Sequence, residues 1–271
     1  MKVDYEFWTI LVACIGAAAW LPHIFRWFYN WFSKPKLRFV PESTTEIGYT
    51  TLGPVFNQTF AISTSRKDAL VERVSLAIIH KSGERHDFHW QALDEKGFEM
   101  TVLSGERAEF RKHQSAIALK ISIFGLVEKK IFFRDFAFQE KALSLFNKYS
   151  EKELHLEKTA GEKFKDEAIK SKEFMDLLDF IKSGFCWREG EYDVWLYAFE
   201  PSLKKPHVEH YKFKLSKIHT KQLEKNIETT QEELRNLILY KGFPADKCPK
   251  VFWNWVNPSF YRVKGKIRLK R

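Results

Sequence analysis

Residues 192–199 read YDVWLYAF, and nearly all of the side chains in this stretch are apolar. Successive side chains of a strand point to opposite faces, so Tyr192, Val194 and Leu196 share one face. The opposite face carries Trp195, Tyr197 and Phe199. A short apolar stretch rich in aromatic residues is typical of a buried strand. We therefore expect a central strand covered on both faces, with Trp195 in the core.

Further strands are predicted on both sides of this stretch. After a loop at 201–206, apolar alternation resumes at 211–215, which predicts a hairpin. Upstream, residues 36–135 contain several alternating runs. The tetrapeptide KSGE at 81–84 is expected to turn the chain between two of them, because glycine tolerates positive φ. The clearest run has apolar residues at every second position: Ile117, Leu119, Ile121 and Ile123.

Helical spacing replaces alternation between residues 139 and 183. Gly161 is expected to separate an earlier helix, near 139–155, from a later one. Ser216 fits the N-cap of a third helix that ends near Lys241. The later helix of the first pair is predicted from one apolar stripe: Phe164, Ala168, Met175 and Leu178.

These patterns predict an α+β, β-rich fold. The strands of 36–135, completed by the hairpin at 191–215, favour an Ig-like antiparallel β-sandwich with a helical insertion. The alternative is two small α+β domains divided near residue 140. We divide the chain into a short N-terminus with a transmembrane anchor at 1–33, sandwich strands at 34–138, the helical insertion at 139–186, completing strands with an amphipathic helix at 187–261, and a basic tail at 262–271.

Residues 7–25, FWTILVACIGAAAWLPHIF, contain no formally charged side chain. About 20 helical residues cross a ~30 Å hydrocarbon core. A cleaved signal peptide would need a basic n-region, whereas Asp4 and Glu6 outnumber Lys2. A buried core helix would leave the flanking pattern unexplained, so a single membrane anchor is favoured over both alternatives. Aromatic residues, which favour the membrane–water interface, follow directly: Trp27, Phe28, Tyr29, Trp31 and Phe32.

The formal net charge of +10 is concentrated in two short clusters, and residues 41–250 are nearly neutral. One cluster follows the apolar segment: Arg26, Lys34, Lys36 and Arg38. The other ends the chain: Arg262, Lys264, Lys266, Arg268, Lys270 and Arg271. The positive-inside rule then places the N-terminus outside and the body in the cytoplasm.

The two clusters form one basic patch if the tail returns to the membrane. Such a patch attracts anionic lipid or an acidic partner. The alternative is a solubilising, frayed terminus. Nucleic-acid binding is the less favoured interpretation, because a nucleic-acid domain more often spreads its cations over a folded face.

The sequence carries no recognisable catalytic motif. The patterns GxxxxGK[ST], GxGxxG and GxSxG do not occur. Three histidines near the expected turn are the best metal candidates, although strand geometry favours exposed side chains over converging ligands: His80, His86 and His89. Three acidic residues share one strand face, which is more typical of a solvated edge than of an acid–base pair: Glu189, Glu191 and Asp193. We assign no catalytic residue, metal ligand or cofactor.

We therefore expect a non-enzymatic, single-pass membrane protein that presents its β-sandwich at the cytoplasmic face. Its role would be scaffolding or regulation through a protein partner. One alternative is a membrane-tethered enzyme of an unrecognised family. Another is a binder of anionic lipid or nucleic acid that acts through the two basic clusters.

Overall fold

A computed structural model describes residues 5–101 and 107–263. Its first half contains α1 (Tyr5–Phe32), β1 (Lys36–Pro41), β2 (Glu46–Thr50), β3 (Gly53–Ser65), β4 (Ala69–Val71), β5 (Arg73–His80), β6 (Arg85–Thr101), β7 (Arg107–Ser115), β8 (Leu119–Ile121) and β9 (Leu126–Arg134). The second half contains α2 (Phe136–Thr159), η1 (Gly161–Lys163), α3 (Phe164–Lys170), α4 (Lys172–Ser183), β10 (Gly190–Phe199), β11 (His207–Leu215), α5 (Lys217–Leu239), η2 (Ala245–Lys247) and β12 (Phe260–Arg262).

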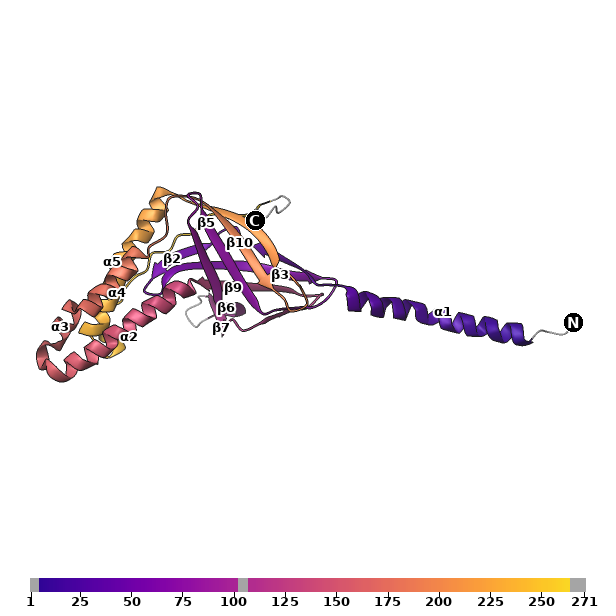
Figure 1. The fold of residues 1–271 in the computed structure, drawn as a ribbon, viewed down its shortest axis with the longest axis horizontal. Helices are drawn as coiled ribbons and strands as arrows, with labels where there is room; N and C mark the ends of the chain where they lie inside the picture. Colours follow the sequence, from indigo (N-terminus) through magenta and orange to yellow (C-terminus); the bar gives the residue numbers. More distant parts are fainter. Residues whose placement is uncertain (1–4, 102–106, 264–271) are drawn as a thin grey trace.

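The fold is mixed α+β and rich in sheet. Within the described residues, ten strands form one antiparallel sheet in the order β1-β3-β9-β6-β5-β10-β11-β12, with β2 paired to β3 and β7 paired to β6. The short strands β4 and β8 pair with each other. The large sheet curls until its edges β1 and β12 approach, so it is nearly closed (Figure 1).

The Ig-like sandwich is not confirmed. A sandwich needs two facing sheets, whereas these strands follow one another in a single hydrogen-bonded order. Strands from before and after residue 140 share that sheet, because β10 pairs with β5 and places Val194 opposite Ile78. The expected hairpin at 191–215 is present as β10 and β11.

The β10 strand is central, as expected, but only one of its faces is covered. Tyr192, Val194 and Leu196 are buried inside the curled sheet. The expectation that Trp195 lies in the core is wrong: it is half-buried on the outer face and stacks on His210, with ring centroids 4.1 Å apart.

Aromatic rings fill the space inside the curled sheet. Tyr192 and Phe213 stack with centroids 4.6 Å apart, and Phe56 contacts Phe213 and Phe260. Such large rings, fully removed from water, supply most of the driving force for closing a sheet of this kind. The sheet interior is therefore a packed core.

The helices α2 to α5 lie together at one end of the sheet, opposite the end from which α1 projects (Figure 1). Gly161 separates α2 from α3, as expected, with φ of 54°. The prediction of one helix with a single apolar stripe from Phe164 to Leu178 is wrong. The Ser171 side chain caps a new helix, α4, by accepting a hydrogen bond from the Phe174 N–H. The expected N-cap Ser216 is confirmed.

One helix in the described part of the chain is long and apolar enough to cross a membrane. Its candidate span is Leu11–Tyr29, and none of that span is buried within the chain. A signal sequence near an N-terminus and the core helix of a soluble protein pass the same test of length and composition. Of the predicted interface aromatics, Trp27, Phe28 and Tyr29 are exposed on α1, and Trp31 and Phe32 occupy its last turn.

Strands β1 and β2 both pair with β3 and form one edge of the sheet, which meets the β11–β12 edge along a seam. This seam is closed in two ways. Toward the helical end, backbone groups join it: the Ile47 N–H donates to Val256 O at 2.9 Å, and the Val256 N–H donates back at 3.0 Å. Toward the α1 end, the Glu209 side chain joins the two edges. Its carboxylate accepts from the Phe39 N–H at 3.1 Å, which joins β11 to β1.

Glu209 is only 1% exposed, and every polar neighbour around it donates. The Tyr211 hydroxyl donates to Oε2 at 2.7 Å, His207 Nε2 lies 2.9 Å from Oε1, and Arg262 Nε lies 3.3 Å from Oε2. Burial alone would raise the pKa of Glu209. The hydrogen bonds from His207, Tyr211 and Phe39, together with the Arg262 charge, outweigh burial and lower it. The carboxylate is therefore held ionised.

We predict that Glu209→Gln destabilises the fold by about 3 kcal/mol, because it leaves the donors around the seam without a charged acceptor. Since the folded-state pKa lies below its usual value of 4.5, this contribution is present above that pH and is lost as pH falls further. Urea unfolding of both chains between pH 7 and pH 3 measures the effect. The exposed Glu232→Gln on α5 is the control. Equal stability of the Glu209 variant and the native chain at pH 7 would contradict this assignment.

Candidate functional site

A hollow of about 480 Å³ opens on the seam, at the end of the sheet where α1 joins it. It begins four residues after the last residue of α1. Its walls come from β1, β3, β11 and β12 and combine cations with hydroxyl groups: Lys36, Leu37, Arg38, Ser63, Thr64, Ser65, His207 and Arg262.

Strand alternation aims the first two cations outward. Leu37 and Phe39 are buried, and Lys36 and Arg38, which alternate with them along β1, are exposed. The register between β1 and β3 then sets Lys36 opposite Ser65 and Arg38 opposite Ser63. Each cation therefore shares a rung of the sheet with a hydroxyl group.

Arg262 reaches the hollow from the other side of the seam. Its Nε lies 3.3 Å from the Glu209 carboxylate, which fixes the direction of the guanidinium. A guanidinium carries five N–H donors in one plane, so donors beyond the one that faces Glu209 remain for a ligand. Three cations and several hydroxyl groups around one open hollow match the chemistry of a bound phosphate or carboxylate.

The predicted basic residues divide into three sets. Lys36, Arg38 and Arg262 line the hollow, so part of each basic cluster meets at one place. Lys34 is exposed just before β1, and Arg26 belongs to α1. The remaining residues lie outside the described part of the chain: Lys264, Lys266, Arg268, Lys270 and Arg271.

Sequence reasoning missed the other walls of the hollow. His207 and the hydroxyl residues of 63–65 carry no local signal, because strand pairing alone brings them to the cations. Glu209 was missed for the same reason, since its partner Phe39 is 170 residues away.

An exposed apolar turn flanks the hollow. Leu126 pairs with Ser63, which pairs with Arg38, so these three side chains form one rung across β9, β3 and β1. Leu126 is 70% exposed, and Phe124 in the preceding turn is 96% exposed. The α1 end of the sheet therefore presents large apolar side chains directly beside cations.

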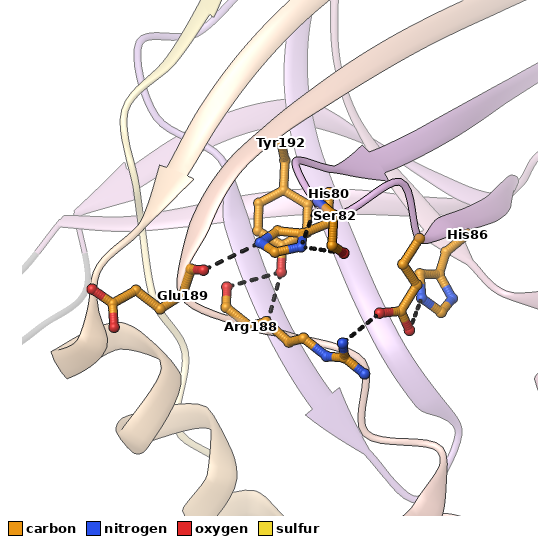
Figure 2. Close-up of polar contacts among 7 residues, drawn as sticks. His80, Ser82, His86, Arg188, Glu189 and Tyr192 are labelled. Carbon is orange, nitrogen blue, oxygen red and sulfur yellow. Dashed lines mark hydrogen bonds and ion pairs between the residues drawn. The ribbon is translucent and has the colours of Figure 1, made fainter.

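A second polar cluster lies at the β5–β6 turn, and Figure 2 shows its geometry. The turn at residues 81–84 forms as expected, with Gly83 at φ 91°. His80 is buried, with Nδ1 2.8 Å from Ser82 Oγ and Nε2 3.2 Å from Glu189 O. Because a carbonyl only accepts, Nε2 carries the proton. Both ring nitrogens are therefore engaged in tying the turn to the start of β10.

The same cluster binds its neighbours through Glu84. Its carboxylate lies 3.2 Å from His86 Nε2 and 3.2 Å from Arg188 Nη1. The Tyr192 hydroxyl accepts from the Arg188 N–H at 2.7 Å, and burial raises the pKa of this tyrosine. The contacts join the hairpin turn to the segment that leads into β10, which gives the cluster a structural role (Figure 2).

The remaining metal candidate, His89, stacks on Phe136 instead of facing the other histidines. In the part of the chain that the structure describes, no group of three or more His, Cys, Asp or Glu side chains is placed to hold a metal ion. The three candidate histidines thus have separate surroundings.

Of the candidate carboxylates, Glu191 and Asp193 share the outer face of β10, whereas Glu189 precedes the strand. Glu189 and Glu191 are exposed, whereas Asp193 lies 2.6 Å from His210 Nε2 across the β10–β11 pair. Cys186 is buried, and burial raises the pKa of its thiol. None of these groups lines the hollow at the seam.

Comparisons with known proteins add little. No protein-family model matches the chain, and no curated protein matches it. Among solved structures, a family 123 glycoside hydrolase from Clostridium perfringens, studied for glycolipid glycan hydrolysis, aligns with 8% sequence identity and a TM-score of 0.33. The alignment covers 68% of this chain but 28% of the hydrolase chain. A likeness this weak supports no conclusion about activity.

Proposed function

We propose that this chain is a single-pass, membrane-anchored interaction protein whose hollow at the seam binds the phosphate of anionic lipid headgroups. One observation carries the proposal: Lys36, Arg38 and Arg262 gather around a hydroxyl-lined hollow four residues beyond a long apolar helix. If α1 spans the bilayer, the hollow lies at headgroup depth. Cations near an anionic surface contribute about 1 kcal/mol each.

The apolar turn supports the same placement. Unless a membrane covers them, Phe124 is almost fully in water and Leu126 is largely so. Burying such side chains fully is favourable by about 1.5–3 kcal/mol each. A surface that pairs exposed apolar side chains with cations is suited to the interface, where acyl chains meet charged headgroups. The body then rests against the bilayer, in addition to being tethered to it.

The proposed topology has the N-terminus outside and the body in the cytoplasm. The positive charge that follows α1 supports this orientation. Recruitment or regulation of a partner at the membrane is the favoured role, because the sequence carries no recognised catalytic motif. A tethered enzyme of an unrecognised family is the alternative.

Charge reversal tests headgroup binding. We expect the full chain, held in phosphatidylcholine nanodiscs, to bind a soluble short-chain phosphatidic acid, and Lys36→Glu with Arg38→Glu to weaken that binding at least about tenfold. Both side chains are exposed, so the fold should persist. The matched control, Lys221→Glu with Lys225→Glu on α5, makes the same change in net charge outside the hollow.

Isothermal titration measures both variants at low and high salt. A parallel titration with inorganic phosphate shows whether the hollow recognises the lipid or the phosphate alone. Tighter binding of the phosphatidic acid than of inorganic phosphate supports a headgroup site. Equal weakening by the control pair, or no binding by the native chain, would count against the proposal.

A topology reporter tests the anchor. A reporter at the C-terminus that distinguishes the two sides should give a cytoplasmic, membrane-bound signal in the full chain. Deletion of residues 1–33 should make the body soluble. An exterior signal would reverse the orientation, and a mature chain that lacks its first residues would identify α1 as a signal peptide.

A further inference from the structure

A second hollow, of about 320 Å³, lies between α2, α4 and α5. These helices stand at the end of the sheet opposite α1 (Figure 1). A bilayer that receives α1 therefore cannot also cover this groove. The occupant must come from the other side of the molecule.

The groove is apolar and open to water. Leu143 and Phe146 of α2 and Leu237 of α5 line it, and both leucines are 59% exposed. These side chains recur at a spacing of three or four residues on their helices, as do contacts between packed helices. An apolar channel flanked by three helices has the shape that receives one further amphipathic helix.

A single carboxylate interrupts the apolar wall. Within the described lining, Glu233 of α5 is the one acidic side chain. Thr51 hydrogen-bonds to it, but its Oε2 is buried without a partner. An acceptor that is buried and unpaired costs about 1–3 kcal/mol, and more when charged. Burial accordingly raises the pKa of Glu233.

Asn236, three residues further along α5, also buries an Nδ2 without a partner. It lines an adjoining hollow that shares Glu233 and Leu237 with the groove. Two unsatisfied polar atoms one turn apart on the same helix are unusual, because buried polar groups are nearly always paired. This face of α5 is therefore incomplete in the isolated chain.

We propose that the groove binds an amphipathic helix of a partner protein, which places leucine-like side chains on the α2–α4–α5 wall and a lysine on Glu233. The lysine ammonium supplies the donor that Oε2 lacks and holds the carboxylate in its charged form. The apolar side chains of the partner bury the exposed leucines. The proposal concerns a different face from the headgroup site and does not depend on it.

The test uses two synthetic amphipathic helices of about five turns, with leucines at i, i+3, i+4 and i+7. They are identical except that one carries a central lysine and its twin carries norleucine. Fluorescence anisotropy measures each peptide against the full chain in phosphatidylcholine nanodiscs, with empty nanodiscs subtracted. We expect the lysine peptide to bind at least about tenfold more tightly than its twin.

Variants of the chain locate the effect. Glu233→Gln should reduce the preference for lysine to about twofold or less while the chain stays folded, because glutamine has nearly the same shape. Leu237→Ser should weaken both peptides, whereas Leu154→Ser, an exposed residue of α2 outside the groove, should weaken neither. Equal binding of the twins, an unchanged preference in Glu233→Gln, or no saturable binding below about 1 mM would overturn the proposal.

Discussion

The buried Glu209 carboxylate closes the curled sheet at its α1 end by accepting a hydrogen bond from the Phe39 N–H. An antiparallel sheet that curls toward closure must satisfy the backbone groups of its two edges, since unpaired edge groups are costly when buried. Near the helical end, backbone bonds between 45–47 and 256–258 do this. Near α1 the edges diverge, and Glu209 bridges them by accepting from the Phe39 N–H. The same carboxylate orients Arg262, so closing the seam also builds the basic hollow.

The two ends of the molecule consequently differ in chemistry. The α1 end presents cations, hydroxyl groups and the exposed Phe124 and Leu126. The helical end presents an apolar groove that contains the Glu233 carboxylate, whose Oε2 has no hydrogen-bond partner. Cations around one hollow and a carboxylate in the other suit a protein that faces an anionic surface on one side and a basic partner on the other. The aromatic core between them holds the two surfaces at a fixed separation.

The sequence pattern correctly predicted the features that depend on contacts within a few residues. The central strand at 192–199, the turn at 81–84 and the Ser216 cap were all correct, because alternation, glycine and side-chain capping act within a few residues. The sequence pattern failed where tertiary contacts decide the structure. The alternating run of 117–123 forms only the short strand β8, and Ile117 is exposed. Three residues of the basic site, Lys36, Arg38 and Arg262, were named from charge alone. Glu209, His207 and Glu233 could not be identified from the sequence, because residues far away in the chain form their surroundings.

The most direct measurement is the depth of the α1 end in a bilayer. The full chain, with Cys14 and Cys248 replaced by serine, would carry a fluorescent label on a cysteine at position 124, with position 252, which is also exposed, as the control. Cys186 is buried and resists labelling. In vesicles containing spin-labelled lipid, we predict strong quenching at position 124 and none at position 252. Equal quenching at the two positions would contradict the claim that the end built around Glu209 faces the membrane.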